Sequence, residues 1–448
     1  MTNDSPDPRA LRVPAGRMVR LGRLGSMAGG IAGGMALNGV RQLGRGQRPE
    51  LRELLLTPAN VRRIADELAQ MRGAAMKIGQ LMSMDTGDVL PPELSDILAR
   101  LRADAHFMPP RQLKQVLNAA WGSDWLRDVR RFDVRPVAAA SIGQVHRAWL
   151  KDGRALAVKV QYPGVARSID SDVANVGALI QMSGLLPKGF DLAPYLDEAR
   201  RQLHEEADYE QEGRYLAEFG ALLAGAEDFA VPELHPDRTT REVLAMSFVE
   251  GTPIEEAADA PQAERDRIAT RLIELLLREL FEFGLMQTDP NFANYRHEAG
   301  SGRIVLLDFG ATRRFHPGIA ESYRRLMAAG LTGDREAMRG AAEDIGFLRP
   351  GIAPAHAGRI LGMMEMAFAA LRAGPVFDFG ATDLPRRMQA EGLALAEDGF
   401  VPPPLPMDAL YLQRKFGGMF LLASRLRARV PLRALLDPYM PGAGSTAA

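Results

Sequence analysis

The sequence predicts an α+β fold, in which a small lobe that contains β-strands is followed by a larger helical lobe. Apolar positions recur at helical spacing from Thr57 to Ala105 and again from Glu264 to Phe283. Between them, Val145 to Val160 has the pattern of two strands separated by Lys151-Asp152-Gly153. An Asp-Gly pair between apolar runs is typical of a β-hairpin, so a sheet is expected between the helical parts.

The other predicted elements follow in chain order. They are a helix opened by Pro109-Pro110 and running through Leu117, helices from Asp170 onwards, strands at Glu242 to Val249 and Arg303 to Leu307, and helix and loop after Pro317. This order predicts four parts: a basic Gly/Ala-rich segment at 1–50, a helical extension at 51–120, the small lobe with a helical insertion at 121–250, and the helical large lobe at 251–440.

The composition excludes several classes of protein. A chain of 448 residues with 46% hydrophobic and 25% charged side chains is typical of a globular protein with more than one packed unit. The 55 basic and 56 acidic side chains give a net charge of -1, so no large basic surface for nucleic acid is expected. The absence of cysteine excludes disulfides, Cys-based zinc sites and thiol catalysis.

The first fifty residues differ from the rest of the chain. They carry eight arginines against three acidic residues, a local net charge of +5. Leu24 to Val40 is uncharged and rich in Gly and Ala, but shorter than the ~18–20 residues that span a bilayer comfortably. Small residues spaced by four favour close helix pairing. Three interpretations stay open: a flexible tail, a helix over residues 25–40 that pairs two copies into a homodimer, or a segment that lies on a membrane surface.

The residues with the strongest chemical signal are one lysine and three polar residues much later in the chain. Lys159 lies in an apolar strand, where a buried ammonium needs an anion such as a phosphate or carboxylate. Asp289 precedes Asn294 by five positions, and Asp308 opens an Asp-Phe-Gly sequence after a strand. This order and spacing match the arrangement in kinases. There the first Asp orients or deprotonates the acceptor, the Asn and second Asp hold Mg²⁺, and the lysine neutralises phosphate charge.

Five ordered segments make the resemblance specific. They are Ala74-Ala75-Met76-Lys77-Ile78-Gly79-Gln80, Ala138 to His146, Glu206-Ala207-Asp208-Tyr209, Gln287 to Asn291, and Leu307 to Arg313. They resemble the UbiB-type atypical kinases of ubiquinone biosynthesis, and most of all the mitochondrial branch. The resemblance covers residues 20 to 435. It implies an atypical protein-kinase-like fold of two lobes, with an N-terminal helical extension and a helical C-terminal region, and it implies ATP and Mg²⁺ as cofactors.

The resemblance also assigns residues to the nucleotide. An alanine-rich loop, Ala138-Ala139-Ala140-Ser141, stands where ordinary kinases have a glycine-rich loop over the phosphates, and its Cβ atoms restrict the backbone. Met246 would lie behind the adenine base. The backbone groups of Ser247 and Val249 would pair with the adenine edge at the hinge between the lobes.

Further acidic and polar residues are expected around the lysine. Glu206 is the predicted partner of Lys159, with Glu205 as a rival. Asp208 is predicted to meet the Lys-x-Gly-Gln segment. The resemblance implies that Lys77 and Gln80 of this segment cover the active site and disfavour protein phosphorylation, whereas the residues alone are also compatible with a solvated helix face. Two acidic residues two positions apart cannot share one helix face, which is why they are given different partners.

The predicted function is that of an atypical kinase or ATPase that supports isoprenoid quinone biosynthesis and acts on or with a small lipid-like molecule or quinone precursor. We expect a cytoplasmic location, peripheral at the inner membrane. A catalytically quiet lipid-binding or assembly pseudokinase and a true protein kinase are the alternatives. The basic C-terminal segment Arg414 to Leu422 has two interpretations, as a helix packed on the large lobe or as a membrane-facing surface.

Overall fold

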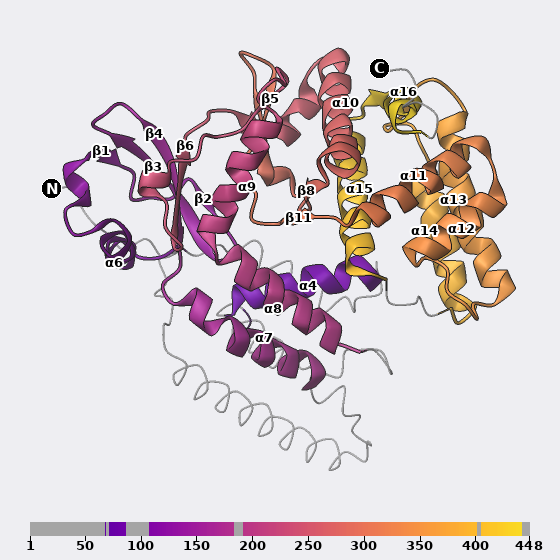
Figure 1. Ribbon diagram of the computed structural model, residues 1–448, viewed down its shortest axis with the longest axis horizontal. Coiled ribbons are helices and arrows are strands. Elements are labelled where there is room, and N and C mark those ends of the chain that lie inside the picture. The colour runs from indigo at the N-terminus through magenta and orange to yellow at the C-terminus, as the bar shows by residue number, and fades with distance from the viewer. Residues whose placement is uncertain (1–67, 69–70, 87–106, 183–190, 401–404, 441–448) are drawn as a thin grey trace, which may run out of the picture. The chain divides into compact units, whose positions relative to one another are not determined.

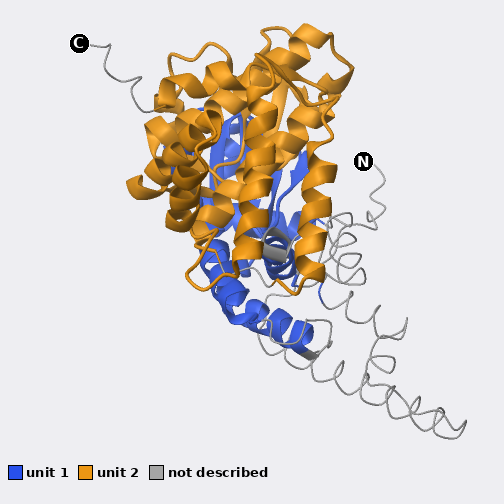
Figure 2. Cartoon of the chain, turned by 90° about the vertical axis from the view of Figure 1, so that its right-hand side faces the viewer, with its two compact units in different colours: residues 1–217, 233–248 blue, residues 218–232, 249–448 orange. Residues whose placement is uncertain are grey.

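The computed structural model describes residues 68, 71–86, 107–182, 191–400 and 405–440 (Figure 1). The segment at 1–50, including the predicted pairing helix at 25–40, lies outside the described residues. The chain divides into two compact units (Figure 2). We call residues 1–217 and 233–248 the small lobe, and residues 218–232 and 249–448 the large lobe. The predicted division into four parts stays a prediction.

The small lobe is built on a five-stranded antiparallel sheet. Four strands have the order β1-β3-β4-β6, and the fifth, β2, pairs with the first half of β3. The predicted hairpin is confirmed, because β3 and β4 pair along their length and turn at Gly153, where φ is +98°. The bounds are β1 Val129–Phe132, β2 Ala138–Ala139, β3 Gly143–Leu150, β4 Ala155–Gln161 and β6 Val243–Ser247.

Two apolar clusters fill the small lobe. One lies between the sheet and α6 and includes Leu117, Val158 and Val160. The second joins α4, α7 and α8 and includes Ile78, Val173 and Leu203. The helices are α4 Arg72–Thr86, α6 Pro110–Trp121, η2 Trp125–Arg127, α7 Val165–Met182, α8 Ala193–Glu206, η3 Pro236–Arg238 and α9 Tyr209–Leu222, whose last residues belong to the large lobe. The helix predicted after Pro109 is confirmed, with Pro109 at the N-cap and Pro110 in the first turn.

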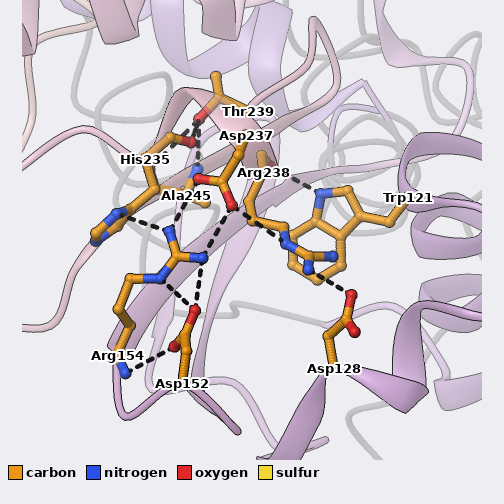
Figure 3. Close-up of polar contacts among 9 residues, drawn as sticks. All are labelled: Trp121, Asp128, Asp152, Arg154, His235, Asp237, Arg238, Thr239 and Ala245. Carbon is orange, nitrogen blue, oxygen red and sulfur yellow. Dashed lines mark hydrogen bonds and ion pairs between the residues drawn. The ribbon is translucent and has the colours of Figure 1, made fainter.

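A polar cluster ties the β3–β4 turn to η3 (Figure 3). Arg154 donates hydrogen bonds to both carboxylate oxygens of Asp237 at 2.9 Å and to Asp152 at 2.8 Å. The hydrogen bond from Arg154 lowers the pKa of Asp237 below its usual range. In the same cluster, Trp121 donates to the carbonyl of Arg238 and Arg238 donates to Asp128. None of the predicted site residues takes part, so the cluster is interpreted as a support of the sheet.

His146 is a buried histidine in the middle of β3. Its Nδ1 is 2.9 Å from the carbonyl oxygen of Asp133, so Nδ1 carries the proton and Nε2 accepts from the amide of Gln144 at 2.8 Å. The ring of Phe132 stacks on it with centroids 5.3 Å apart. Burial lowers the pKa of His146 to about 4. The native small lobe therefore holds this imidazole in its neutral form.

This burial predicts a loss of stability in acid. An unfolded histidine has a pKa of about 6.5. The contribution of neutral His146 is complete above that pH and declines as pH falls towards 4, because only the unfolded chain takes up the proton. The loss amounts to roughly 3 kcal/mol at pH 4. We expect urea unfolding of His146→Gln to depend less on pH between 7.5 and 4.5 than that of the wild type. Substitution of the exposed His204 serves as the control, and equal pH dependence in all three proteins would contradict the prediction.

The large lobe contains short strands and many helices. A four-stranded sheet has the order β5-β10-β9-β7, and two-stranded sheets are formed by β8 with β11 and by β12 with β13. The strand bounds are β5 Phe229–Ala230, β7 Thr252–Pro253, β8 Leu285–Gln287, β9 Tyr295–Glu298, β10 Arg303–Leu306, β11 Thr312–Arg314, β12 Phe377–Asp378 and β13 Arg429–Val430. The expectation of helix and loop alone after Pro317 is therefore wrong for β12 and β13, which are too short to leave an alternating pattern.

The helices of the large lobe begin with the predicted long apolar helix. It is α10 Gln262–Arg278, and it continues as the π-helix η5 Glu279–Phe283, which ends at Gly284 with φ +59°. The others are η4 Ile254–Asp259, η6 Phe292–Asn294, α11 Pro317–Thr332, α12 Arg335–Ile345, α13 Pro354–Arg372, α14 Leu384–Glu397, α15 Met407–Arg425, α16 Leu432–Leu436 and η7 Asp437–Tyr439. Among the residues that the structure describes, no helix has both the length and the apolar character to cross a membrane.

Candidate active site

Lys159 forms a buried ion pair in the small lobe. It lies on β4 opposite Val145 of β3, and its Nζ is 2.7 and 2.9 Å from the two carboxylate oxygens of Glu212 on α9. The Glu212 side chain is only 2% exposed, and the ring of Tyr209 lies 5.1 Å from the ammonium. Two hydrogen bonds to one carboxylate fix the direction of the lysine side chain.

The predicted pairing of Lys159 with Glu206 is wrong. Glu206 is the last residue of α8, whereas Glu212 lies in the next helix, α9. The rival Glu205 is also not the partner, because its carboxylate pairs with Arg201 at 2.8 Å. The chain changes direction between the two helices at Ala207 and Asp208, so the two glutamates serve different lysines. Two helices, α7 and α8, separate Lys159 from its acidic partner along the chain.

Glu206 instead pairs with Lys77 of the Lys-x-Gly-Gln segment on α4. Its other oxygen accepts a hydrogen bond from the hydroxyl of Ser141 at 2.9 Å. Asp208 was predicted to meet this segment, but its carboxylate accepts from the backbone N–H of Gln211 and caps α9. Gln80 is half-buried on the same helix as Lys77. One glutamate thus joins the Lys-x-Gly-Gln helix to the alanine-rich loop.

The alanine-rich loop is the turn between β2 and β3. Ala138 and Ala139 are exposed and pair with β3, and the N–H of Ala140 donates to the carbonyl of Gly143 at 2.8 Å. A Cβ on Gly143 would lie 2.5 Å from the carbonyl oxygen of Val160, so this position requires glycine. The turn is consequently closed by backbone hydrogen bonds and by the contact of Ser141 with Glu206.

The predicted hinge residues lie at the end of β6. Met246 is buried and pairs with Ala157. The N–H of Ser247 donates to the carbonyl of Glu233 at 2.8 Å, and the Ser247 hydroxyl accepts from the N–H of Glu233. The prediction that the Ser247 N–H pairs with adenine is therefore wrong, since the carbonyl of Glu233 already accepts from it. Pairing of adenine with the Ser247 carbonyl and with the backbone of Val249 stays a prediction.

Asp289 and Asn294 lie together in the large lobe, as their spacing suggested. The Nδ2 of Asn294 donates to Asp289 Oδ2 at 3.1 Å and to the Asp289 carbonyl at 3.2 Å. The loop between them is closed by Asn291, whose side chain accepts from the N–H of Ala293 and caps η6. Asp289 Oδ1 is 2.5 Å from the guanidinium of Arg414 on α15. Both carboxylate oxygens of Asp289 are therefore held.

Backbone pairing brings Asn294 next to Asp308. β9 begins directly after Asn294 and is antiparallel to β10, and the N–H of Leu307 donates to the carbonyl of Asn294 at 3.0 Å. Asp308 Oδ1 accepts from the N–H of Gly310 at 2.9 Å. Phe309 is buried, and its ring lies 4.9 Å from that of Phe219. Half-buried Asn294 and Asp308 thus lie at neighbouring strand ends in the large lobe.

Comparison with known proteins identifies the family. The ABC1 atypical kinase-like domain matches residues 100–342, more than half of the chain. The mitochondrial atypical kinase COQ8 of Saccharomyces cerevisiae is 37% identical over 422 residues, which cover 93% of this chain and 83% of that protein. This chain belongs to the ABC1 (UbiB) atypical kinase family. The predicted resemblance and the atypical-kinase α+β fold are thereby confirmed.

Other ABC1 relatives differ in how much of their length is matched. The mitochondrial COQ8B of Rattus norvegicus is 39% identical, with 96% of this chain and 82% of the relative covered. The mitochondrial coq-8 of Caenorhabditis elegans is 38% identical, but this chain spans 56% of its length. Among solved structures, Rv3197 of Mycobacterium tuberculosis, in complex with erythromycin, has a TM-score of 0.62 and 25% identity, with 84% of this chain and 95% of that chain covered.

Sequence reasoning assigned no role at the site to three charged residues of this chain, Glu212, Arg414 and Lys415. The distribution of lysine in the sequence bears on two of them, Glu212 and Lys415. The chain has six lysines among its 55 basic residues. Lys77, Lys159 and Lys415 are buried, and each lies beside a glutamate: Glu206, Glu212 and Glu279 respectively. Exposed cations in the described parts are mostly arginine, whereas three of the five described lysines lie in buried ion pairs.

Proposed function

We propose that this chain is an atypical kinase or ATPase that binds Mg-ATP and supports isoprenoid quinone (ubiquinone) biosynthesis. It would act on or with a small lipid-like molecule rather than phosphorylate proteins. The observation that carries the proposal is the buried pair of Lys159 and Glu212 in the small-lobe sheet. A fixed ammonium on a strand is what phosphate recognition by kinases requires. Lys159 would neutralise phosphate charge, and Glu212, in place of Glu206, would orient it.

The polar groups of the large lobe fit a magnesium ion. Mg²⁺ is held by one or two protein oxygen ligands together with phosphates and water. Asp308 supplies a carboxylate, and Asn294 supplies an amide oxygen, because its nitrogen is committed to Asp289. A bound Mg²⁺ held by these two residues would supply positive charge to offset that of the phosphates. Asp289 would orient the water or hydroxyl that receives the phosphoryl group.

The acceptor is proposed to be small rather than a protein. The Lys-x-Gly-Gln helix α4 is part of the small-lobe core through Ile78, and Lys77 is paired with Glu206. These contacts support the proposal that α4 is a fixed part of the fold. In the family that the sequence resembles, this segment covers the active site. The relatives are named mitochondrial. For this chain, a cytoplasmic position peripheral to the inner membrane stays a prediction.

Thermal unfolding tests binding of Mg-ATP. At a nucleotide concentration 100 times Kd, the native state gains about 2.7 kcal/mol, which is a rise of several degrees in Tm. We expect this rise with ATP and Mg²⁺ and a smaller one with ATP and EDTA. Asp308→Asn should lose the part that depends on Mg²⁺, whereas the exposed Asp383→Asn should retain it. The proposal fails if Mg-ATP leaves the Tm of the wild type unchanged.

A genetic experiment separates catalysis from a quiet assembly role. Quinones and their precursors are measured after deletion of the gene and after complementation with wild type or Asp308→Asn. Normal quinone in the deletion strain removes the pathway from the proposal. Full rescue by Asp308→Asn favours the pseudokinase alternative, and labelled phosphate transferred from ATP to added protein favours the protein-kinase alternative.

A further inference from the structure

Helix α15 contacts the Asp289 loop through three residues within one and a half turns. The loop runs from Gln287 at the end of β8 to Asn294. Arg414 reaches Asp289, Lys415 reaches Gln287, and Gly418 lies against Pro290. Residues four apart on a helix share a face, so Arg414 and Gly418 meet the loop from the same side. The segment that sequence patterning left open as a membrane-facing surface instead has its cations turned into the large lobe.

Lys415 anchors the helix to the start of the loop. Its side chain is 3% exposed, and its Nζ donates to the Gln287 carbonyl at 2.7 Å and to the Tyr295 hydroxyl at 3.0 Å. The carboxylate of Glu279, in the π-helix, lies 3.4 Å from the same ammonium. Desolvation lowers the pKa of Lys415, but the charge of Glu279 and the interactions with Tyr295 together outweigh it, and the net shift is upward. The ammonium therefore stays charged and fixes α15 against β8.

Gly418 allows the helix backbone to approach the loop. A Cβ at this position would lie 2.2 Å from the Cβ of Pro290, which is closer than any real contact of this kind. Pro290 follows Asp289 directly and has a fixed φ. Because the rigid Pro290 packs directly against the backbone of α15 at Gly418, the backbone of Asp289 has little freedom.

Arg414 completes the support at the side chain. Its guanidinium takes Oδ1 of Asp289 while Asn294 takes Oδ2, so the plane of the carboxylate is set from both sides. Charge-assisted hydrogen bonds of this kind are short and directional. We propose that Arg414 is a positioning residue that sets the orientation of the Asp289 carboxylate for phosphoryl transfer, with α15 as its rigid support. This inference rests on the proposed function.

Steady-state ATP turnover of five variants tests the proposal. Arg414→Gln should lower kcat between about 10- and 100-fold, the range expected when a catalytic group is displaced by about 1 Å, with KM for ATP little changed. Arg414→Lys should retain part of the activity. Arg425→Gln is the matched control, because Arg425 is exposed on the same helix. In an Asp289→Asn background, Arg414→Gln should cause no further loss, since residues that act as a unit are not additive.

The outcomes separate this inference from the proposed function. A wild type that hydrolyses or transfers no phosphate contradicts the proposed activity. The inference is then decided by hydrogen exchange of the peptide that covers residues 285–295, where Arg414→Gln should speed exchange of the Ala293 and Asn294 amides and Arg425→Gln should not. The inference is overturned if Arg414→Gln leaves hydrogen exchange of this peptide unchanged, or if its ATP turnover equals that of Arg425→Gln. It is also overturned if Arg414→Gln lowers turnover as much in the Asp289→Asn background as in the wild type.

Discussion

Replacing Lys415 with methionine is expected to lower the free energy of unfolding of the large lobe by about 3–5 kcal/mol. The substitution leaves the carboxylate of Glu279, only 1% exposed, without its counter-charge. It also removes the donor to the carbonyl of Gln287 and to the hydroxyl of Tyr295. Urea unfolding, followed by a signal from the large lobe, measures the loss.

A second variant shows whether the unpaired charge is the cause. The double variant Glu279→Gln/Lys415→Met should regain part of the lost stability, because a neutral amide is less costly to bury than an unpaired carboxylate. Arg425→Met is the control for loss of one positive charge from the same helix. A loss of less than about 1 kcal/mol in Lys415→Met would mean that water or another group replaces the ammonium at little cost.

Glu212→Gln is expected to lower ATP turnover on the order of 100-fold, as is typical when a preorganised charged partner of a reacting centre is removed. Its carboxylate holds Lys159 with two hydrogen bonds of 2.7 and 2.9 Å in a buried place. Without it, the lysine loses the two hydrogen bonds that set its direction and its buried counter-charge. Turnover and nucleotide affinity, measured together, distinguish a loss of catalysis from a loss of binding.

Glu206→Gln and Glu210→Gln provide the comparison. Glu206 pairs with Lys77, so its substitution should loosen the Lys-x-Gly-Gln helix and affect turnover less than Glu212→Gln does. Glu210 is exposed in the first turn of the same helix as Glu212 and should have little effect. If Glu206→Gln reduced turnover more than Glu212→Gln, the assignment of the two glutamates to their lysines would be reversed.

The sequence predicted the elements whose signals are local. The Asp-Gly turn at residues 152–153 and Pro109-Pro110 determine backbone shape within a few residues, and both elements are found where they were expected. The spacing of Asp289, Asn294 and Asp308 likewise reflects a short strand pair, β9 and β10, that brings them together. Long-range partners, by contrast, leave little trace in spacing alone.

The partner of Lys159 was misassigned because the break between α8 and α9 was overlooked. Asp208 begins α9 as its cap, and its carboxylate accepts from Gln211 three residues later. An acidic cap followed by a polar residue at this spacing is a signal of a helix start. Had it been used, Glu206 and Glu212 would have been placed on separate helices, and either could then have been the partner of the lysine.

The inward orientation of Lys415 was missed for a different reason. Charged residues are rarely fully buried, so a basic helix near the C-terminus favours an exposed interpretation. The spacing of apolar residues nevertheless indicates the buried face of α15, because Met419 and Leu422 follow Lys415 by four and seven positions and all three are buried. A cation on the apolar face of a helix predicts a buried anion, which here is Glu279.

The scarcity of lysine gives this chain few reactive amines, and the fold divides them sharply. Lys114 and Lys151 are exposed, whereas Lys77, Lys159 and Lys415 are buried in ion pairs. Lys415 is also the single lysine in residues 218–448. Amine-directed acylation should therefore modify the exposed lysines first and reach each buried one only when its glutamate releases it. The three buried amines form a set of covalent reporters, two in the small lobe and one in the large lobe, that needs no engineered label.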